Sequence, residues 1–255
     1  MKYRRELASF PSMSADAATP DVPEITHEHP DVTGGWLRPA VFGAMDGLVS
    51  NLALIAGVAG GTRGQADSSA VVLAGLAGLA AGAFSMAARE YTSVASQSEA
   101  ARREIDKERR EIVANPTAEI SELADMYVEK GLDRELALQV AHQIHADVDN
   151  AVNVHAREEL GVDPDDLPSP TLAAGSSFLS FAVGALLPVL PYLLGAHVLL
   201  PGLLVTLVAL FACGAVVTQV TNRSWWFGGL RQMLLGGAAA GLTYLFGSLV
   251  GGGLG

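Results

Sequence analysis

Residues 43–51 read Gly-Ala-Met-Asp-Gly-Leu-Val-Ser-Asn and place one acidic residue, Asp46, inside the first long apolar run of the chain. No other Asp or Glu falls within the apolar runs described below. A carboxylate at membrane depth costs a few kcal/mol or more, so a functional role is the default interpretation. Such a group can hold a proton while its site is empty and release it when a cation binds. The alternative is a packing contact in which Ser50 or Asn51 satisfies the carboxylate.

The composition is that of a membrane protein. Half of the 255 residues are hydrophobic, 28 are glycine and only 17% are charged. The apolar residues form uninterrupted runs, which an ordinary soluble domain does not need. Five apolar runs of about 20 residues or more are each long enough to cross a hydrocarbon core of about 30 Å. They cover residues 39–61, 69–88, 171–194, 198–220 and 230–251. We predict an all-α, polytopic membrane protein with five transmembrane helices.

A water-facing helical domain is predicted between the second and third spans. No Pro or Gly interrupts residues 83–114, so the second span is expected to continue into water as one helix. Pro116 breaks this helix, Gly131 ends a second one, and Gly161 ends a third that is kinked near residues 147–150. The inserted domain is therefore expected to contain three helices.

The charges divide the chain in the same way. Nineteen of the 27 Asp and Glu, but only nine of the 16 Lys and Arg, lie in residues 89–170, which gives this segment a net charge of −10. An acidic surface repels nucleic acid and attracts cations, so nucleic acid is excluded as a partner. We predict a disordered cytosolic tail at residues 1–35, spans 1 and 2 within 36–88, the acidic domain at 89–170 and spans 3–5 within 171–255.

The basic residues of the short loops predict the orientation, because such residues gather on the cytosolic side. In a five-span topology, one side of the membrane carries the acidic domain and most of these basic residues, and only Arg63 lies on the opposite side. The basic residues on the side of the acidic domain are Lys2, Arg4, Arg5, Arg38, Arg223 and Arg231. We expect a multi-pass protein of the cell membrane, with the N-terminus and acidic domain cytosolic and the C-terminus outside. The basic N-terminus has no apolar core behind it and does not predict a cleaved signal peptide.

Met86 is a candidate partner for Asp46. It lies near the cytosolic end of the second span and could reach the depth of Asp46 in an antiparallel hairpin. A lone methionine in an apolar helix is usually core packing. Paired with a carboxylate, however, its thioether favours a borderline transition metal over Mg²⁺ or Ca²⁺. Two ligands are too few, and a two-fold dimer axis would double them.

The acidic domain offers carboxylates at helical spacing, where residues three or four apart share a face. Several such groups, together with one imidazole, could hold divalent cations if they converge. The alternative is an ordinary solvated face on which basic residues pair with the glutamates. The candidates are Glu104, Glu108 and Glu111 on the first helix, Glu119 and Glu122 on the second, and His155 and Glu159 on the third.

Other classes of function find little support. The chain has no HExxH, GxSxG or P-loop motif, and Cys213 is its only cysteine, so cysteine-pair metal sites are excluded and an enzyme is not predicted. The remaining alternative to transport is a membrane-anchored buffer or sensor of divalent metal, whose spans only hold the acidic domain.

Four motifs resemble the vacuolar iron transporter family, which includes nodulin-like proteins and bacterial members. They are Met-Asp-Gly-Leu around Asp46, Ala-Ala-Gly-Ala-Phe-Ser-Met-Ala-Ala-Arg-Glu-Tyr at 80–91, Ser-Gln-Ser-Glu at 96–99 and His-Ala-Arg-Glu-Glu-Leu-Gly at 155–161. The resemblance extends from about residue 36 to residue 252.

The resemblance implies a five-span homodimer in the lipid bilayer that moves Fe²⁺, and also Mn²⁺, out of the cytosol in exchange for protons. It also implies a cytosolic metal-binding domain and no organic cofactor. By position, Asp46 and Met86 match the aspartate and methionine of the pore. The metal-binding glutamates of the family match Glu108, Glu111, Glu119, Glu122 and Glu159.

This chain departs from the plant-type pattern at three places. Pro39 stands where a further pore aspartate is found, and Gly78 stands where the second span carries a glutamate. His155 and Ala156 replace methionines of the cytosolic domain. The route into the pore is therefore expected to be less acidic, with His155 in the place of a thioether ligand.

Overall fold

The computed structural model describes residues 36–62, 68–221 and 224–253, and every regular element within these ranges is an α-helix. The expected all-α class is thus confirmed for the described part of the chain. The predicted tail at 1–35, together with Arg63 and Arg223, lies outside it. The helices are α1 (Leu37–Gly61), α2 (Ser68–Ala114), α3 (Pro116–Glu129), α4 (Arg134–Ile144), α5 (Val148–Glu158), α6 (Pro170–Leu193), α7 (Leu199–Thr221) and α8 (Trp225–Gly253).

Five of these helices, α1, α2, α6, α7 and α8, are long and apolar enough to cross a membrane. They coincide with the five predicted runs to within one or two residues at most ends. The last one begins earlier than expected, at Trp225 instead of residue 230. The N–H groups of Phe227 and Gly228 already donate to the Ser224 carbonyl, so the helix forms as soon as the polar loop ends. The membrane-protein class follows from these lengths and compositions.

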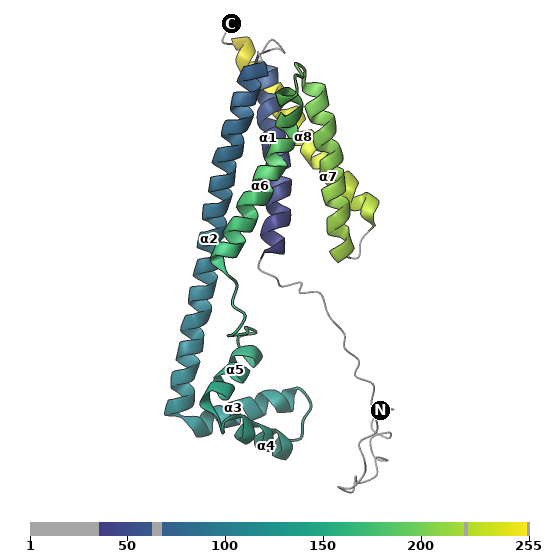
Figure 1. The fold of residues 1–255 in the computed structure, drawn as a ribbon. Coiled ribbons are helices and arrows are strands. Elements are labelled where there is room, and N and C mark those ends of the chain that lie inside the picture. The colour runs from purple at the N-terminus through teal and green to yellow at the C-terminus, as the bar shows by residue number, and fades with distance from the viewer. Residues whose placement is uncertain (1–35, 63–67, 222–223, 254–255) are drawn as a thin grey trace, which may run out of the picture. The chain divides into compact units, whose positions relative to one another are not determined.

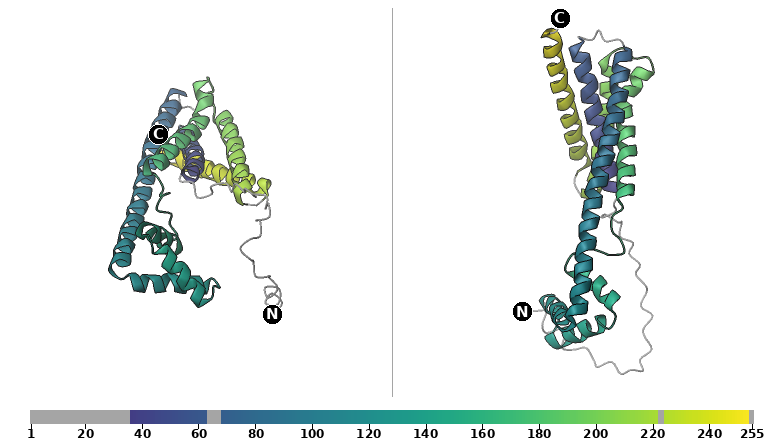
Figure 2. Two further views of the ribbon diagram at one scale, coloured as in Figure 1. Left: turned by 60° about the horizontal axis from the view of Figure 1, so that its bottom comes forward. Right: turned by 90° about the vertical axis from the view of Figure 1, so that its left-hand side faces the viewer.

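Helix α1 is the centre of the bundle, because it contacts each of α2, α6, α7 and α8 (Figures 1 and 2). Asn51 joins three of these helices. Its side-chain Nδ2 donates to the Gly75 carbonyl of α2 at 3.1 Å and to the Ala185 carbonyl of α6 at 2.5 Å. In an apolar interior this amide holds α1, α2 and α6 in one register.

Small residues let the helix backbones touch, as is usual between membrane helices. A Cβ added to Gly184 of α6 would collide with the backbone of Ala44 in α1. On the other side of α1, a Cβ on Gly247 of α8 would collide with the Gly57 carbonyl. The position of α1 therefore depends on two glycines of its neighbours.

Beyond its apolar part, α2 continues to Ala114 as predicted, and α5 packs against it (Figure 1). Ile112 of α2 is buried with Ala151 and Val152 of α5, while α3 and α4 form a second small core around Leu123. We call residues 89–160 the helical extension.

The expected third helix of this extension is in fact two helices, α4 and α5. The Asp147 carboxylate accepts hydrogen bonds from the N–H groups of Asp149 and Asn150 and so starts α5 anew. The position predicted to be a kink is thus a complete break between two helices.

We predict that Gly184→Ala destabilises the bundle, because its methyl group must push α6 away from α1. The melting temperature of the full chain in detergent should fall by several degrees. Gly175→Ala on the same helix is the matched control, since nothing lies within 4 Å of its added Cβ. Equal melting temperatures for the two variants would contradict the close approach of α1 and α6.

Candidate metal centre

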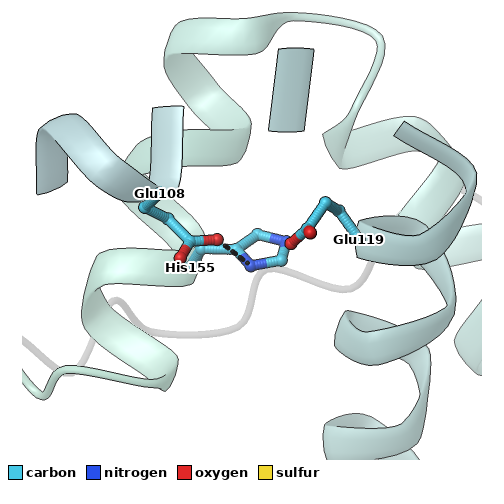
Figure 3. Close-up of side chains that lie close together, drawn as sticks. All are labelled: Glu108, Glu119 and His155. Atoms are coloured by element: carbon cyan, nitrogen blue, oxygen red, sulfur yellow. Dashed lines mark ion pairs between the residues drawn. The ribbon is translucent and has the colours of Figure 1, made fainter. Parts of the chain in front are cut away.

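Three helices of the extension each present one ligand side chain to a common point (Figure 3). Glu108 comes from α2 and His155 from α5, two helices held together around Ile112. Glu119 lies in the first turn of α3, because Pro116 ends α2 and starts α3 as its first residue. A carboxylate in the first turn is favoured by the helix dipole.

The three side chains are close together and buried. One ligand atom from each of Glu108, Glu119 and His155 lies within 4.8 Å of the other two. Their exposed fractions are 7%, 8% and 0%. In Figure 3 the two carboxylates lie at opposite edges of the imidazole ring, with the Glu119 carboxylate beside the nitrogen that faces away from Glu108. Mixed oxygen and imidazole ligands suit divalent transition metals.

The polar contacts of the cluster are incomplete. His155 Nδ1 hydrogen-bonds Glu159 Oε1 at 2.6 Å and lies 2.9 Å from Glu108 Oε1. Within the described residues, His155 Nε2 and Glu108 Oε1 are buried and have no hydrogen-bond partner. Leaving such atoms unsatisfied costs about 1–3 kcal/mol each. When Nδ1 donates to Glu159, Nε2 keeps the lone pair that a metal ion requires.

Burial also changes the proton affinity of the cluster. Desolvation, reinforced by the charge of Glu159, raises the pKa of Glu108 from 4.5 to about 7, although His155 opposes the shift. The pKa of Glu119 is raised by desolvation and then by Glu122. The site therefore holds a proton near neutral pH and can exchange it for a cation.

His145, which is not among the predicted ligands, supports this arrangement. Its ring packs edge-to-face on that of His155, with centroids 5.1 Å apart, and its Nδ1 contacts the Ala141 carbonyl at 2.9 Å. Desolvation lowers its pKa, which keeps the imidazole neutral beside the cluster. Because His145 follows the last residue of α4 and His155 lies in α5, their spacing in the sequence carries no signal of this contact.

Comparison with known proteins identifies the family. The model of the VIT family matches residues 37–248, which is most of the chain. The chain belongs to the VIT family. It is 37% identical to a protein of Acanthamoeba castellanii named vacuolar iron transporter, over 83% of this chain and 77% of that protein. It is also 30% identical to vacuolar iron transporter 1 of Oryza sativa, over 86% of this chain and 88% of that protein. The resemblance seen in the sequence motifs is thereby confirmed.

The other glutamates expected in this VIT-family chain lie at different distances from the cluster. Glu159 contacts His155 directly, while Glu111 and Glu122 lie next to the cluster and raise the pKa values of Glu108 and Glu119. Glu104 is exposed and takes part in none of these contacts. It lies one turn before Glu108 on α2, at an exposed position.

Asp46 lies on a face of α1 that the described residues leave open. Asp46, Ser50 and Leu54 are exposed at successive turns, and Ser50 donates to the backbone oxygen of Asp46. Within the described residues nothing hydrogen-bonds or ion-pairs with the Asp46 carboxylate. A hollow of about 720 Å³ continues along this face between α1 and α8.

Met86 is buried in a cluster with Ala83, Phe181 and Ala185 and is 6% exposed. Its sulfur accepts a contact from Arg89 Nη2 at 2.9 Å. It lines a cavity with Pro39 but shares no described contact with Asp46. Within the described residues, no hydrogen bond or buried cluster joins the two pore residues that the sequence predicted.

Gly78, the second departure from the family pattern, lies against Asn51. A Cβ on Gly78 would lie 2.8 Å from Asn51 Oδ1 and would collide with the Leu54 side chain. A glutamate at this position would therefore require its neighbours to move. The glycine allows the contact between α1 and α2 at this depth.

We predict that the affinity of the full chain for Mn²⁺ depends on pH through Glu108. Because the carboxyl group is protonated below its pKa of about 7, Mn²⁺ must displace a proton there. Binding should thus be about tenfold weaker at pH 6 than at pH 8. Electron paramagnetic resonance of the free ion measures this directly.

Glu108→Gln should bind Mn²⁺ weakly at both pH values, because the amide cannot supply the charge. Glu104→Gln, one turn away and exposed, is the matched control and should behave as the unaltered chain does. If Glu108→Gln retained the affinity and the pH dependence, Glu108 would not be a ligand.

Proposed function

We propose that this protein exports Fe²⁺, and also Mn²⁺, from the cytosol in exchange for protons. The observation that carries the proposal is the buried cluster of Glu108, Glu119 and His155, in which two ligand atoms have no hydrogen-bond partner among the described residues. Membership of the VIT family and similarity to proteins named vacuolar iron transporters support iron as the cargo.

In this proposal the helical extension is the cytosolic metal-binding domain, and it collects the cation. Its negative charge attracts divalent ions, and the orientation is supported by the distribution of Lys and Arg. Glu108 would release its proton as the ion binds, with Glu159 and Glu119 close enough to share the charge.

The second step takes the ion to Asp46. Along α2, Glu108 and Met86 are 22 residues apart, or about 33 Å, so the ion must leave the first site completely. Asp46 then receives it inside the span and later takes up a proton from outside. Met86 is its thioether partner, provided that the contact with Arg89 opens.

The open face of α1 supports a homodimer. An exposed carboxylate facing lipid is costly, and here it lies beside a hollow between α1 and α8. A second copy related by a two-fold axis would cover this face and bring two Asp46 residues to one pore.

The decisive test is Fe²⁺ flux into liposomes that contain the purified chain, with internal pH recorded at the same time. Under an imposed pH gradient, the unaltered chain should move Fe²⁺ and protons in opposite directions. Asp46→Asn should reduce the flux to that of empty liposomes, since the amide can neither hold the cation nor carry the proton.

Asp106→Asn, which removes an exposed carboxylate of the extension, is the matched control and should transport normally. Transport by Asp46→Asn at the rate of the unaltered chain would refute the mechanism. Metal binding without flux in every variant would instead identify a membrane-anchored buffer or sensor.

A further inference from the structure

A cavity of about 350 Å³ lies where α2 passes the first turns of α1. Arg38 follows the first residue of α1, and Arg89 follows the last residue of the apolar run at 69–88. Both arginines therefore stand at the end of an apolar segment, which is the level of the lipid headgroups. The lining of the cavity includes Arg38, Met86, Arg89, Glu90, Ser93 and Gln97.

Among the described residues, no carboxylate forms an ion pair with either guanidinium group of this cavity. Within the described residues, Arg89 contacts the sulfur of Met86, and Arg38 lies over the Phe42 ring at 5.9 Å. Glu90 is the one carboxylate of the lining and is not within ion-pair distance of either arginine. By contrast, Arg109 and Arg157 of the extension each form ion pairs with aspartates.

The cavity also contains a hydroxyl donor, Ser93. Gln97 Nε2 donates to Ser93 Oγ at 3.1 Å, which leaves the Ser93 hydroxyl hydrogen free to donate. A neutral thioether is a poor partner for a guanidinium, whereas phosphate oxygens bind its paired N–H groups strongly. The cavity thus combines two positive charges and a hydroxyl donor, opposed by the single charge of Glu90.

We propose that this cavity binds a phosphate group through Arg38 and Arg89, either from the headgroup of an anionic lipid or as free phosphate. Binding draws Arg89 from Met86 and leaves the thioether free for a cation. This second effect rests on the proposed transport function. Occupancy of the cavity would then control access to the pore from the side of the helical extension.

Binding is tested on the purified full chain in neutral detergent. Short-chain phosphatidylglycerol, short-chain phosphatidylcholine and inorganic phosphate are titrated separately by isothermal titration calorimetry. The unaltered chain should bind phosphatidylglycerol more tightly than phosphatidylcholine. The double variant Arg38→Gln/Arg89→Gln should bind phosphatidylglycerol at least about tenfold more weakly, because two charge-assisted contacts are lost.

The control is Arg103→Gln/Arg110→Gln, which removes the same charge from exposed positions of α2 outside the cavity. Competition by inorganic phosphate would identify a free anion as a ligand, and its absence would identify the lipid. The proposal is overturned if the unaltered chain binds neither phosphatidylglycerol nor inorganic phosphate. It is also overturned if the Arg38→Gln/Arg89→Gln variant binds phosphatidylglycerol as tightly as the control variant does. Unchanged melting temperatures establish that the variants fold.

The link to transport is measured separately. Fe²⁺ flux should be faster in liposomes containing phosphatidylglycerol than in phosphatidylcholine alone, and the cavity variant should lose this difference. If the chain binds phosphatidylglycerol but its Fe²⁺ flux does not depend on the lipid, the release of Met86 is wrong and the anion site still stands. Absence of Fe²⁺ flux from the unaltered chain in all liposomes would instead count against the transport function. The calorimetry would still show whether the cavity binds a phosphate group.

Discussion

An ionisable side chain that leaves water must be neutralised, and this constraint shapes both candidate cation sites. Near the end of α2, Glu108 is buried beside Glu119 and His155, and desolvation raises its pKa to about 7. Hydrogen bonds inside the cluster satisfy only part of it, because His155 Nε2 and Glu108 Oε1 have no hydrogen-bond partner among the described residues. A proton or a cation can complete the cluster, and exchange between the two is the chemistry on which the proposed function depends.

The same constraint applies to Asp46, which is exposed on its helix, whereas Glu108 is buried. It is exposed on α1 in a part of the chain that is apolar enough to span a membrane, and no described residue compensates its charge. The side-chain Nδ2 of Asn51, only five residues away, instead donates two hydrogen bonds that join α1 to α2 and α6. Helix α1 thus has one polar residue, Asn51, that joins it to neighbouring helices, and another, Asp46, whose carboxylate has no partner among the described residues. A second copy and a cation would provide that partner in the proposed mechanism.

Much of the fold could be predicted from hydropathy and from helix breakers. The apolar runs predicted the five long helices, and the absence of Gly and Pro from residues 83–114 predicted the length of α2. The contacts between helices could not be predicted in this way. Helical spacing put Glu104 and Glu108 on one face, but it does not tell which turn another helix covers, so Glu104 is exposed while Glu108 is buried. The contact of His145 with His155 is likewise tertiary and leaves no periodic pattern.

The central claim is that the cluster of Glu108, Glu119 and His155 is where the cation is first bound. Electron spin echo envelope modulation of Mn²⁺ bound to the full chain tests it most directly, since a coordinated imidazole nitrogen modulates the echo. The account predicts a nitrogen coupling that changes on ¹⁵N-histidine labelling and disappears in His155→Leu, while His142→Leu, at an exposed position of α4, retains it. Bound Mn²⁺ without nitrogen coupling, or with a coupling that survives in His155→Leu, would contradict the account.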